Sequence, residues 1–135
     1  MISGIGTDIV SIERIASGWN ARREPFAKKI LGQEEYEEYQ NRLQQSDARA
    51  VRYLATRFAA KEAFGKAFGS GIRHPVNWHD LQILNDDLGK PVVRTAGELA
   101  QKMTGEGWIA QVSLSDEQLF AVAFVVIEKR GMHHE

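Results

Sequence analysis

Two acidic residues and one lysine are the side chains of this sequence best suited to chemistry. Glu62 and Lys66 are four residues apart in a stretch predicted to form one long helix, and Glu62 falls within an apolar stripe of that helix. Asp8 belongs to a short predicted strand near the N-terminus, where Gly4 and Gly6 share its face. A carboxylate among apolar side chains is costly unless it is paired, hydrogen-bonded or bound to a metal. Glu62 therefore indicates either an ion pair or a metal site.

Two interpretations of these residues stay open at the level of sequence. Glu62 and Lys66 could form an ordinary i,i+4 salt bridge, and Asp8 could cap the helix that follows its strand. If instead the long helix packs on the glycine face of the strand, Asp8 and Glu62 converge. Two carboxylates without a nearby histidine or cysteine suit a hard cation such as Mg²⁺. The cationic side chains and turn amides around them are of the kind that hold a pyrophosphate: Arg57, Lys61, Lys66 and the amides of residues 69–71.

The composition favours one soluble domain. The chain has 135 residues, of which 43% are hydrophobic, so we expect a single domain over residues 1–130 and a short tail over 131–135. The net charge is only -1, so the chain as a whole has no electrostatic attraction for nucleic acid or a membrane surface. The sequence has no cysteine, which excludes thiolate metal sites and a cysteine nucleophile, and it shows neither a secretory signal pattern nor a membrane-spanning run. These features favour a cytoplasmic protein that binds neither nucleic acid nor membranes.

The hydrophobic pattern predicts an α+β fold, in which a small, mostly antiparallel sheet packs on one long helix with shorter helices around it. In the first half of the chain we expect a strand over 2–10 that ends on an open face at Asp8, followed by helices over 12–19, 25–31 and 34–43. The long helix then runs from residue 46 or 47 to a glycine turn at 69–71. In the second half we expect a hairpin with strands at 81–83 and 92–93, a helix over 98–103 closed by Gly105 or Gly107, and a second hairpin with strands over 109–114 and 119–128. The last strand is apolar on both faces, so something must cover each side. One cover is the long helix, and the other could be a neighbouring subunit.

Positive charge concentrates in the first helical region, although the whole chain is nearly neutral. The residues that carry it are Arg14, Arg22, Arg23, Lys28 and Lys29. Such a cluster is most often a solvated helix face, and the functional alternative is a docking surface for an acidic partner.

Three sequence motifs occur in order along the chain. The first is Gly4-Ile5-Gly6-Thr7-Asp8-Ile9-Val10 followed by Glu13-Arg14-Ile15, the second is Arg57-Phe58-Ala59-Ala60-Lys61-Glu62-Ala63 with Lys66-Ala67-Phe68-Gly69-Ser70-Gly71-Ile72, and the third is Asn85-Asp86-Asp87-Leu88-Gly89-Lys90-Pro91. Together they resemble the holo-[acyl-carrier-protein] synthase family of small phosphopantetheinyl transferases, over essentially the whole chain. The resemblance implies the 4′-phosphopantetheinyl transferase fold. It also implies transfer of 4′-phosphopantetheine from coenzyme A to a serine of an acyl carrier protein, with release of 3′,5′-ADP, in fatty acid and lipid biosynthesis.

The same resemblance implies roles for particular residues. Asp8 and Glu62 would be Mg²⁺ ligands and Lys66 would hold a coenzyme A phosphate, and these three form the expected catalytic set. The coenzyme pocket would be formed by Arg57, Phe58 and the Gly69-Ser70-Gly71 turn, with Gly89-Lys90-Pro91 at the nucleotide end. The carrier protein would be faced by Arg14, Arg22 and Arg23. The family is trimeric with active sites between subunits, which would also explain the doubly apolar last strand.

One segment departs from the family pattern. Many relatives carry a histidine in a Ser-x-Ser-His segment, whereas this chain has Ser113-Leu114-Ser115-Asp116. A contact between that histidine and a coenzyme phosphate cannot be transferred to Asp116, because its charge is wrong for such a contact.

The reaction implied by the resemblance is attack of the carrier serine on the β-phosphorus of coenzyme A. Phosphoryl transfer depends mainly on positioning and on neutralising charge, which Mg²⁺ and Lys66 would supply. The serine proton would pass to Glu62 or Asp8 through a metal-bound water, and the sequence does not choose between them. Two rival functions remain: a metal-dependent pyrophosphate hydrolase that acts on coenzyme A or a nucleotide, and a non-catalytic protein whose basic helix binds an acidic partner.

Overall fold

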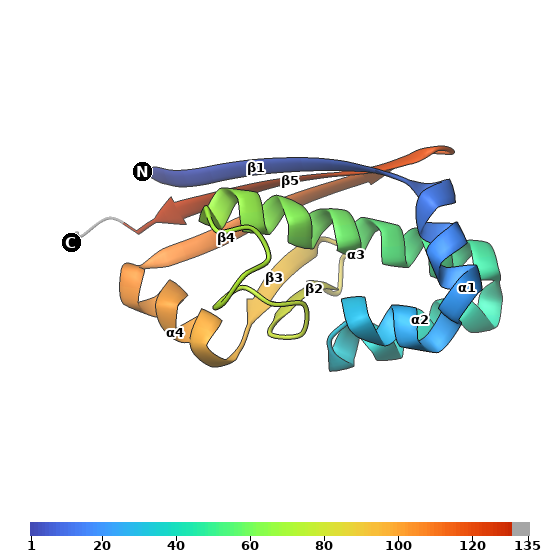
Figure 1. The fold of residues 1–135 in the computed structure, drawn as a ribbon. Coiled ribbons are helices and arrows are strands. Elements are labelled where there is room, and N and C mark those ends of the chain that lie inside the picture. Colours follow the sequence, from blue (N-terminus) through green and yellow to red (C-terminus); the bar gives the residue numbers. More distant parts are fainter. Residues whose placement is uncertain (131–135) are drawn as a thin grey trace.

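A long central helix, α3 (Asp47–Phe68), runs across one face of a three-stranded sheet in the computed structural model, which describes residues 1–130 (Figure 1). The other elements are β1 (Ile2–Ser11), α1 (Ile12–Ile30), α2 (Gln33–Gln45), β2 (Leu81–Asn85), β3 (Pro91–Thr95), α4 (Gly97–Glu106), β4 (Trp108–Asp116) and β5 (Phe120–Lys129). α2, the β2–β3 hairpin and α4 lie on the side of α3 away from the sheet. The predicted α+β fold is therefore confirmed. The predicted tail, residues 131–135, lies outside the described residues.

Every strand pairing is antiparallel, as predicted. β5 is the central strand of the larger sheet, whose order is β1-β5-β4, and β2 pairs with β3 in a separate two-stranded sheet. The β2–β3 turn is organised by Asp86, whose carboxylate accepts hydrogen bonds from the amides of Leu88 and Lys90. Because β1 and β4 are the two outer strands, they form opposite edges of the sheet on which α3 lies.

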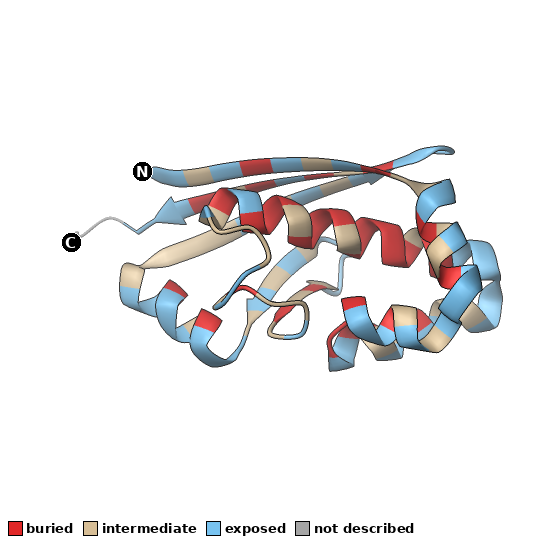
Figure 2. Cartoon of the chain, in the orientation of Figure 1, coloured by how far each residue is buried: buried red, intermediate tan, exposed pale blue. Residues whose placement is uncertain are grey.

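The limits of α3 follow from its capping residues. Ser46 is the N-cap, and its hydroxyl accepts a hydrogen bond from the amide of Arg49. Gly69 closes the helix in the left-handed conformation, with φ of 104°, which glycine adopts at little cost. Between these caps the helix is buried on almost every side, as the red ribbon in Figure 2 shows. The predicted buried helix is confirmed.

The long helix packs on the glycine face of β1, which the sequence left open as one of two possibilities. A Cβ atom built at Gly4 would lie 1.9 Å from the carbonyl oxygen of Ala67, and one at Gly6 would lie 2.1 Å from that of Ala63. No side chain fits at either position, so backbone packs against backbone where β1 crosses α3. This contact brings the face of β1 that carries Asp8 against the C-terminal half of α3.

The first strand forms as predicted, but the predicted position of Asp8 at its end is wrong. β1 continues to Ser11 and pairs with β5 throughout that extension, so Asp8 lies inside the strand. The cap of α1 is Ser11, whose hydroxyl accepts a hydrogen bond from the amide of Arg14. Asp8 is therefore not the residue that caps α1, and its carboxylate is left for other partners.

The two helices predicted before residue 32 are both present, as two helical segments of α1 joined at a kink. Arg22 has φ of -147° and ψ of 40°, which is not helical, and Pro25 follows within the second segment. The first segment is anchored by Trp19, whose indole N–H donates to the hydroxyl of Tyr39 at 2.7 Å. Within residues 1–130, no helix is both long and apolar enough to cross a membrane.

Only one face of β5 is covered within this chain. Ala121, Ala123 and Val125 are fully buried on the face toward α3. On the outer face Phe124 is 45% exposed, and Ile9 of the neighbouring β1 is 62% exposed. The outer face of the sheet is therefore an exposed apolar surface in the single chain.

Candidate functional site

Asp8 and Lys66 join β1 to α3 at one edge of the sheet. The Lys66 ammonium donates to the Asp8 carboxylate, with Nζ and Oδ1 3.2 Å apart, and to the carbonyl oxygen of Thr7 at 2.9 Å. The Lys66 side chain is half exposed, so a ligand can approach it. The alternative salt bridge between Lys66 and Glu62 is not formed: Lys66 pairs with the strand and not within its own helix.

Glu62 lies one turn before Lys66 and has an unusual environment. It is partly buried, and its side chain makes no hydrogen bond or ion pair with any residue between 1 and 130. Burial raises the pKa of the Glu62 carboxyl, the charge on Asp8 raises it further, and Lys66 opposes both effects. Asp8 is therefore close enough for its charge to act on Glu62, and a bound cation would relieve the repulsion between the two carboxylates.

The donor set fits a hard divalent cation that is shared with a substrate. Across the described part of the chain, no cluster of three or more acidic or histidine side chains gathers to form a complete metal cage. Asp8 and Glu62 would supply two carboxylate ligands, and water or substrate oxygens would complete the shell. Mg²⁺ is commonly bound in this way, through one or two carboxylates together with substrate phosphates.

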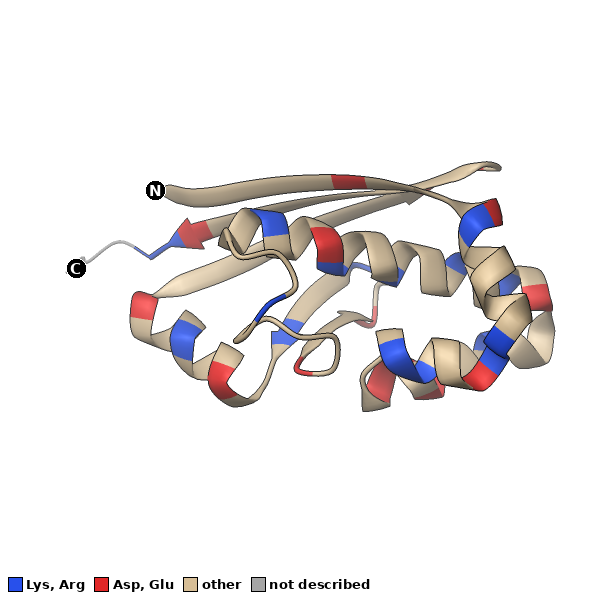
Figure 3. Ribbon diagram, viewed as in Figure 1, with Lys and Arg blue, Asp and Glu red and all other residues tan. Residues whose placement is uncertain are grey.

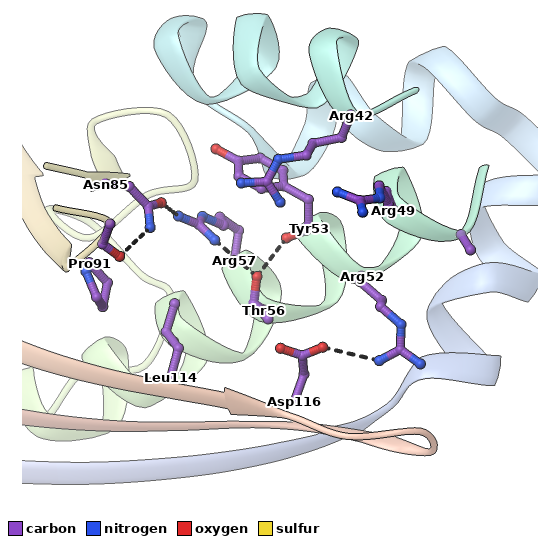
Figure 4. A pocket seen from close by; sticks show the side chains of 12 residues that line it. Arg42, Arg49, Arg52, Tyr53, Thr56, Arg57, Asn85, Pro91, Leu114 and Asp116 are labelled. Carbon is purple, nitrogen blue, oxygen red and sulfur yellow. Dashed lines mark hydrogen bonds and ion pairs between the residues drawn. The ribbon is translucent and has the colours of Figure 1, made fainter. Parts of the chain in front are cut away.

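A second candidate site lies at the opposite edge of the sheet, beside β4. A cavity of about 570 Å³ lies between α2, α3, the β2–β3 hairpin and the end of β4, and Figure 4 shows the side chains that line it. Four arginines line it: Arg42, Arg49, Arg52 and Arg57. The remaining lining residues are Ala48, Tyr53, Thr56, Asn85, Gly89, Pro91, Leu114 and Asp116. A cavity of this size with so many guanidinium groups is suited to a phosphorylated ligand.

Arg57 is the most firmly held of these arginines. Its Nε donates to the carbonyl oxygen of Ile83 at 2.9 Å, its Nη1 donates to the Thr56 hydroxyl at 3.1 Å, and its Nη2 donates to the side-chain oxygen of Asn85. The guanidinium also lies 4.2 Å from the centre of the Tyr53 ring. Burial lowers the pKa of Arg57 from its usual value, and the cost of that burial is offset by these hydrogen bonds.

The residues predicted for the coenzyme pocket are distributed over different places. Arg57, Gly89 and Pro91 line the arginine cavity, and Lys90 is exposed beside them. Phe58 does not line that cavity; its ring stacks on Trp78, with centroids 5.4 Å apart. The turn of residues 69–71 closes α3 one turn beyond Lys66, and so lies near the carboxylate pair.

The sequence analysis missed Arg42, Arg49, Arg52 and Asn85 as members of the cavity. A signal was available for two of them, because Arg49 and Arg52 are three residues apart and so lie next to each other on one face of a helix. No sequence signal links Arg42 or Asn85 to this cavity, because they come from α2 and from the end of β2.

Lys61 is the clearest error among the predicted phosphate-binding groups. Its side chain is fully buried and is paired with the equally buried Glu35, with Nζ and Oε1 2.5 Å apart. The helix directs Lys61 toward α2 and the loop before β2, away from Lys66 and the arginine cavity. A phosphate cannot reach this ammonium group.

The predicted docking arginines lie on the surface of α1, where Figure 3 shows blue basic residues. Arg14 and Arg22 are exposed, and their side chains make no ion pair within residues 1–130. Arg23 is held in place: it pairs with Asp47 at 3.0 Å and stacks over Trp19, 3.8 Å from the ring centre. Arg14 and Arg22 are therefore freer than Arg23 to meet a partner.

Asp116, where many relatives carry histidine, lies at the mouth of the arginine cavity. Its carboxylate accepts a hydrogen bond from Arg52 at 3.0 Å, and the same guanidinium donates to the carbonyl oxygen of Glu117 at 2.6 Å. Asp116 therefore holds Arg52 against the β4–β5 turn, as the dashed line in Figure 4 shows.

Comparison with known proteins gives this geometry a context. The 4′-phosphopantetheinyl transferase superfamily matches residues 4–125. The holo-[acyl-carrier-protein] synthase of Herminiimonas arsenicoxydans is 51% identical over 130 residues, which cover 96% of this chain and 100% of that protein. The crystal structure of the synthase from Neisseria meningitidis is 44% identical, with a TM-score of 0.86 and coverage of 96% of this chain and 100% of that chain. A synthase structure from Bacillus anthracis, described as a complex with CoA (3′,5′-ADP), is 35% identical, with a TM-score of 0.81 and coverage of 96% and 99%. The chain therefore belongs to the 4′-phosphopantetheinyl transferase superfamily, and within it to the holo-[acyl-carrier-protein] synthases.

Proposed function

We propose that this protein transfers 4′-phosphopantetheine from coenzyme A to a serine of an apo acyl carrier protein and releases 3′,5′-ADP. The observation that carries the proposal is the ion pair of Lys66 with Asp8 across the β1–α3 contact, with Glu62 one helical turn before Lys66. Family membership and the B. anthracis synthase, whose structure is described with CoA (3′,5′-ADP), point to the same substrate. Fatty acid and lipid biosynthesis is the process that such a carrier protein serves.

Asp8 and Glu62 hold Mg²⁺ in this proposal, and the ion when bound neutralises charge on the pyrophosphate of coenzyme A. Lys66 contributes a second, fixed positive charge, since its side chain is half exposed and its ammonium is tethered to β1. Glu62 would receive the serine proton through a water molecule, because its carboxylate makes no hydrogen bond or ion pair with residues 1–130, whereas Asp8 already accepts a hydrogen bond from Lys66.

The arginine cavity takes the nucleotide end of coenzyme A in this proposal. Its four arginines and the predicted Gly89-Lys90-Pro91 segment provide cationic groups and a close backbone approach. The cavity lies beside β4, whereas Asp8 lies on β1 and Glu62 on α3 beside it, so the two sites lie toward opposite edges of one sheet. A homotrimer resolves this separation, because the cavity of one subunit can meet the carboxylate pair of the next.

The exposed outer face of the sheet is the natural candidate for that subunit contact. Ile5 and Ile9 of β1 and Phe124 of β5 are each more than one third exposed on this face. Exposed apolar side chains that adjoin one another on a sheet favour association with another protein surface. A neighbouring copy of this chain would then cover the outer face of β5, the last strand, which is apolar on both faces.

The acidic carrier protein docks on α1 in this proposal. Arg14 lies in the first turn of α1, close in sequence to the strand that carries Asp8, and its charged side chain is exposed. Arg22 is exposed at the kink, and Arg23 extends the same basic surface. Charge complementarity of this kind speeds association and orients the partner.

An intact-mass measurement tests the transfer directly. The protein is incubated with an apo carrier protein, coenzyme A and Mg²⁺, and the carrier is expected to gain the mass of one phosphopantetheine group while 3′,5′-ADP accumulates. An Asp8→Asn variant serves as the matched control and is expected to leave the carrier unmodified. Release of nucleotide without a mass gain would support the rival hydrolase. No metal-dependent binding of coenzyme A in calorimetry would support the non-catalytic alternative.

A further inference from the structure

The buried ion pair between Lys61 and Glu35 is the most elaborate polar cluster of the described fold outside the two candidate sites. Both side chains have no exposed surface. The Lys61 ammonium donates to the Glu35 carboxylate at 2.5 Å, to the carbonyl oxygen of Ile30 at 2.8 Å and to that of Trp78 at 2.7 Å. An ammonium group has three protons, so all of its donors are used. One side chain of α3 thus ties together the end of α1, the start of α2 and the loop before β2.

Glu35 uses its two oxygens in different directions. Oε1 accepts from Lys61 and from the amide of Gly32 at 2.9 Å, while Oε2 accepts from the amide of Ile83 at 2.7 Å. The Ile83 amide belongs to β2, and both the N–H and the C=O of this residue point away from β3. The free edge of β2 is therefore pinned from the inside by a buried carboxylate.

The other backbone group of Ile83 leads to the arginine cavity. Its carbonyl oxygen accepts the hydrogen bond from Nε of Arg57 at 2.9 Å. A continuous chain of hydrogen bonds therefore runs from Lys61 through Glu35 and the Ile83 peptide groups to Arg57. Arg57 ends that chain with its guanidinium in the cavity wall, bound to Asn85.

Burial makes this chain sensitive to loss of any one member. Burial lowers the pKa of Lys61, and the adjacent Glu35 carboxylate opposes that shift. Removing one partner of a buried pair leaves the other charge uncompensated, and that is strongly destabilising. If the ion pair had only a structural role, its loss would lower the stability of the fold without changing the affinity for a ligand.

We propose that Glu35 and Lys61 are positioning residues for the nucleotide end of coenzyme A, because they fix β2 so that Ile83 presents Arg57 to the cavity. This inference rests on the proposed function, since it takes coenzyme A as the ligand of the arginine cavity. Neither residue touches that ligand. They act through the N–H and C=O groups of Ile83, because the ion pair fixes the position of these groups relative to α3.

Calorimetric titration of 3′,5′-ADP into the folded protein tests the inference. Glu35→Gln keeps the shape of the side chain, but one of its terminal atoms becomes a donor and opposes either Lys61 and Gly32 or the Ile83 amide. We expect its Kd for 3′,5′-ADP to rise about tenfold, the size of effect that loss of one well-placed charged hydrogen bond produces. Glu34→Gln is the matched control: it is the same change one residue earlier, at an exposed carboxylate that pairs with Arg94, and it should leave Kd unchanged.

A double-variant comparison separates positioning from general damage. If Glu35 acts through Arg57, then Glu35→Gln should add no further loss of affinity to a chain that already carries Arg57→Ala. If the two losses are additive, or if Glu35→Gln alone binds 3′,5′-ADP as the unmodified chain does, the inference is overturned. Absence of binding by the unmodified chain would contradict the proposed function instead.

Glu35→Asp covers the case in which Glu35→Gln does not fold. The aspartate keeps the negative charge beside Lys61, but it is one methylene shorter and cannot reach Lys61 and the Ile83 amide together. We expect it to fold and still to bind 3′,5′-ADP about tenfold more weakly. Unchanged affinity in this variant would equally overturn the inference.

Discussion

Gly6→Ala is the sharpest test of how the carboxylate pair is assembled. The Cβ of an alanine at this position would lie 2.1 Å from the carbonyl oxygen of Ala63 and 2.7 Å from the amide nitrogen of Ala67. Ordinary van der Waals contact begins at 3.4 Å, so β1 and α3 must separate by roughly 1 Å to admit one methyl group. Both clashing atoms are backbone, so no side-chain rearrangement can relieve the overlap.

The separation has two measurable consequences. Overpacking of this kind costs about 1–3 kcal/mol of unfolding free energy, which urea denaturation would detect as a lower midpoint with an unchanged slope. It also moves Glu62 and Lys66 on α3 away from Asp8 on β1, so Mg²⁺ affinity measured by calorimetry should fall in the folded protein. The two effects come from the same displacement and should appear together.

Gly105→Ala provides the matched control. Gly105 lies within α4, its φ is not positive, and a Cβ there meets no atom within 4 Å. The same substitution should therefore stabilise the fold by about 1 kcal/mol, through helix propensity alone, and leave Mg²⁺ affinity unchanged. A Gly6→Ala protein with the stability and Mg²⁺ affinity of the unmodified chain would refute the close β1–α3 contact as the basis of the site.

Three further substitutions test the charges and surfaces of the protein. Glu62→Gln should abolish Mg²⁺-dependent transfer. It should also raise the melting temperature of the metal-free protein at neutral pH, because the raised pKa of Glu62 disfavours its ionised form in the folded state. This increase in melting temperature should shrink as the pH falls through the folded-state pKa of Glu62 and vanish below the usual value of 4.5; an increase that grew with acidification would contradict the direction of the pKa shift. Arg14→Glu should raise the KM for the carrier protein, most strongly at low salt, and leave the KM for coenzyme A unchanged. An unaltered carrier KM would move the docking surface elsewhere. Phe124→Glu should convert a trimer to monomers in light scattering, since it places a charge on the apolar outer face of the sheet; an unchanged mass would exclude that face as the interface.

The elements of this fold were largely predictable because their signals are local. Ser46 and Gly69 mark the two ends of α3 by their capping chemistry, and Asp86 lies in a polar turn between two β-branched runs. The glycine face of β1 was equally informative, since glycine in a strand signals that another backbone comes close. The two helical segments of α1 were also predicted, and Arg22, whose backbone is not helical, separates them.

The pairing of charged side chains was less predictable. Lys61 and Lys66 lie on the same helix near Glu62, and sequence spacing alone made Lys66 a partner of Glu62 and Lys61 a phosphate ligand. In the structure Lys66 bonds to Asp8, which is 58 residues away, and Lys61 bonds to Glu35, which is 26 residues away. Helical periodicity fixes the direction in which a side chain leaves its helix but says nothing about which distant segment meets it there.

The sequence by itself determined the residues of the proposed metal site: two carboxylates and a lysine, held by a strand with a bare glycine face and a helix with defined ends. Only the tertiary structure decided that Asp8 lies inside its strand, that Lys61 is sealed in the core, and that four arginines from two helices share one cavity. The reason is physical. Composition and periodicity act over a few residues, whereas burial and ion pairing depend on distances set by elements that are remote in the chain.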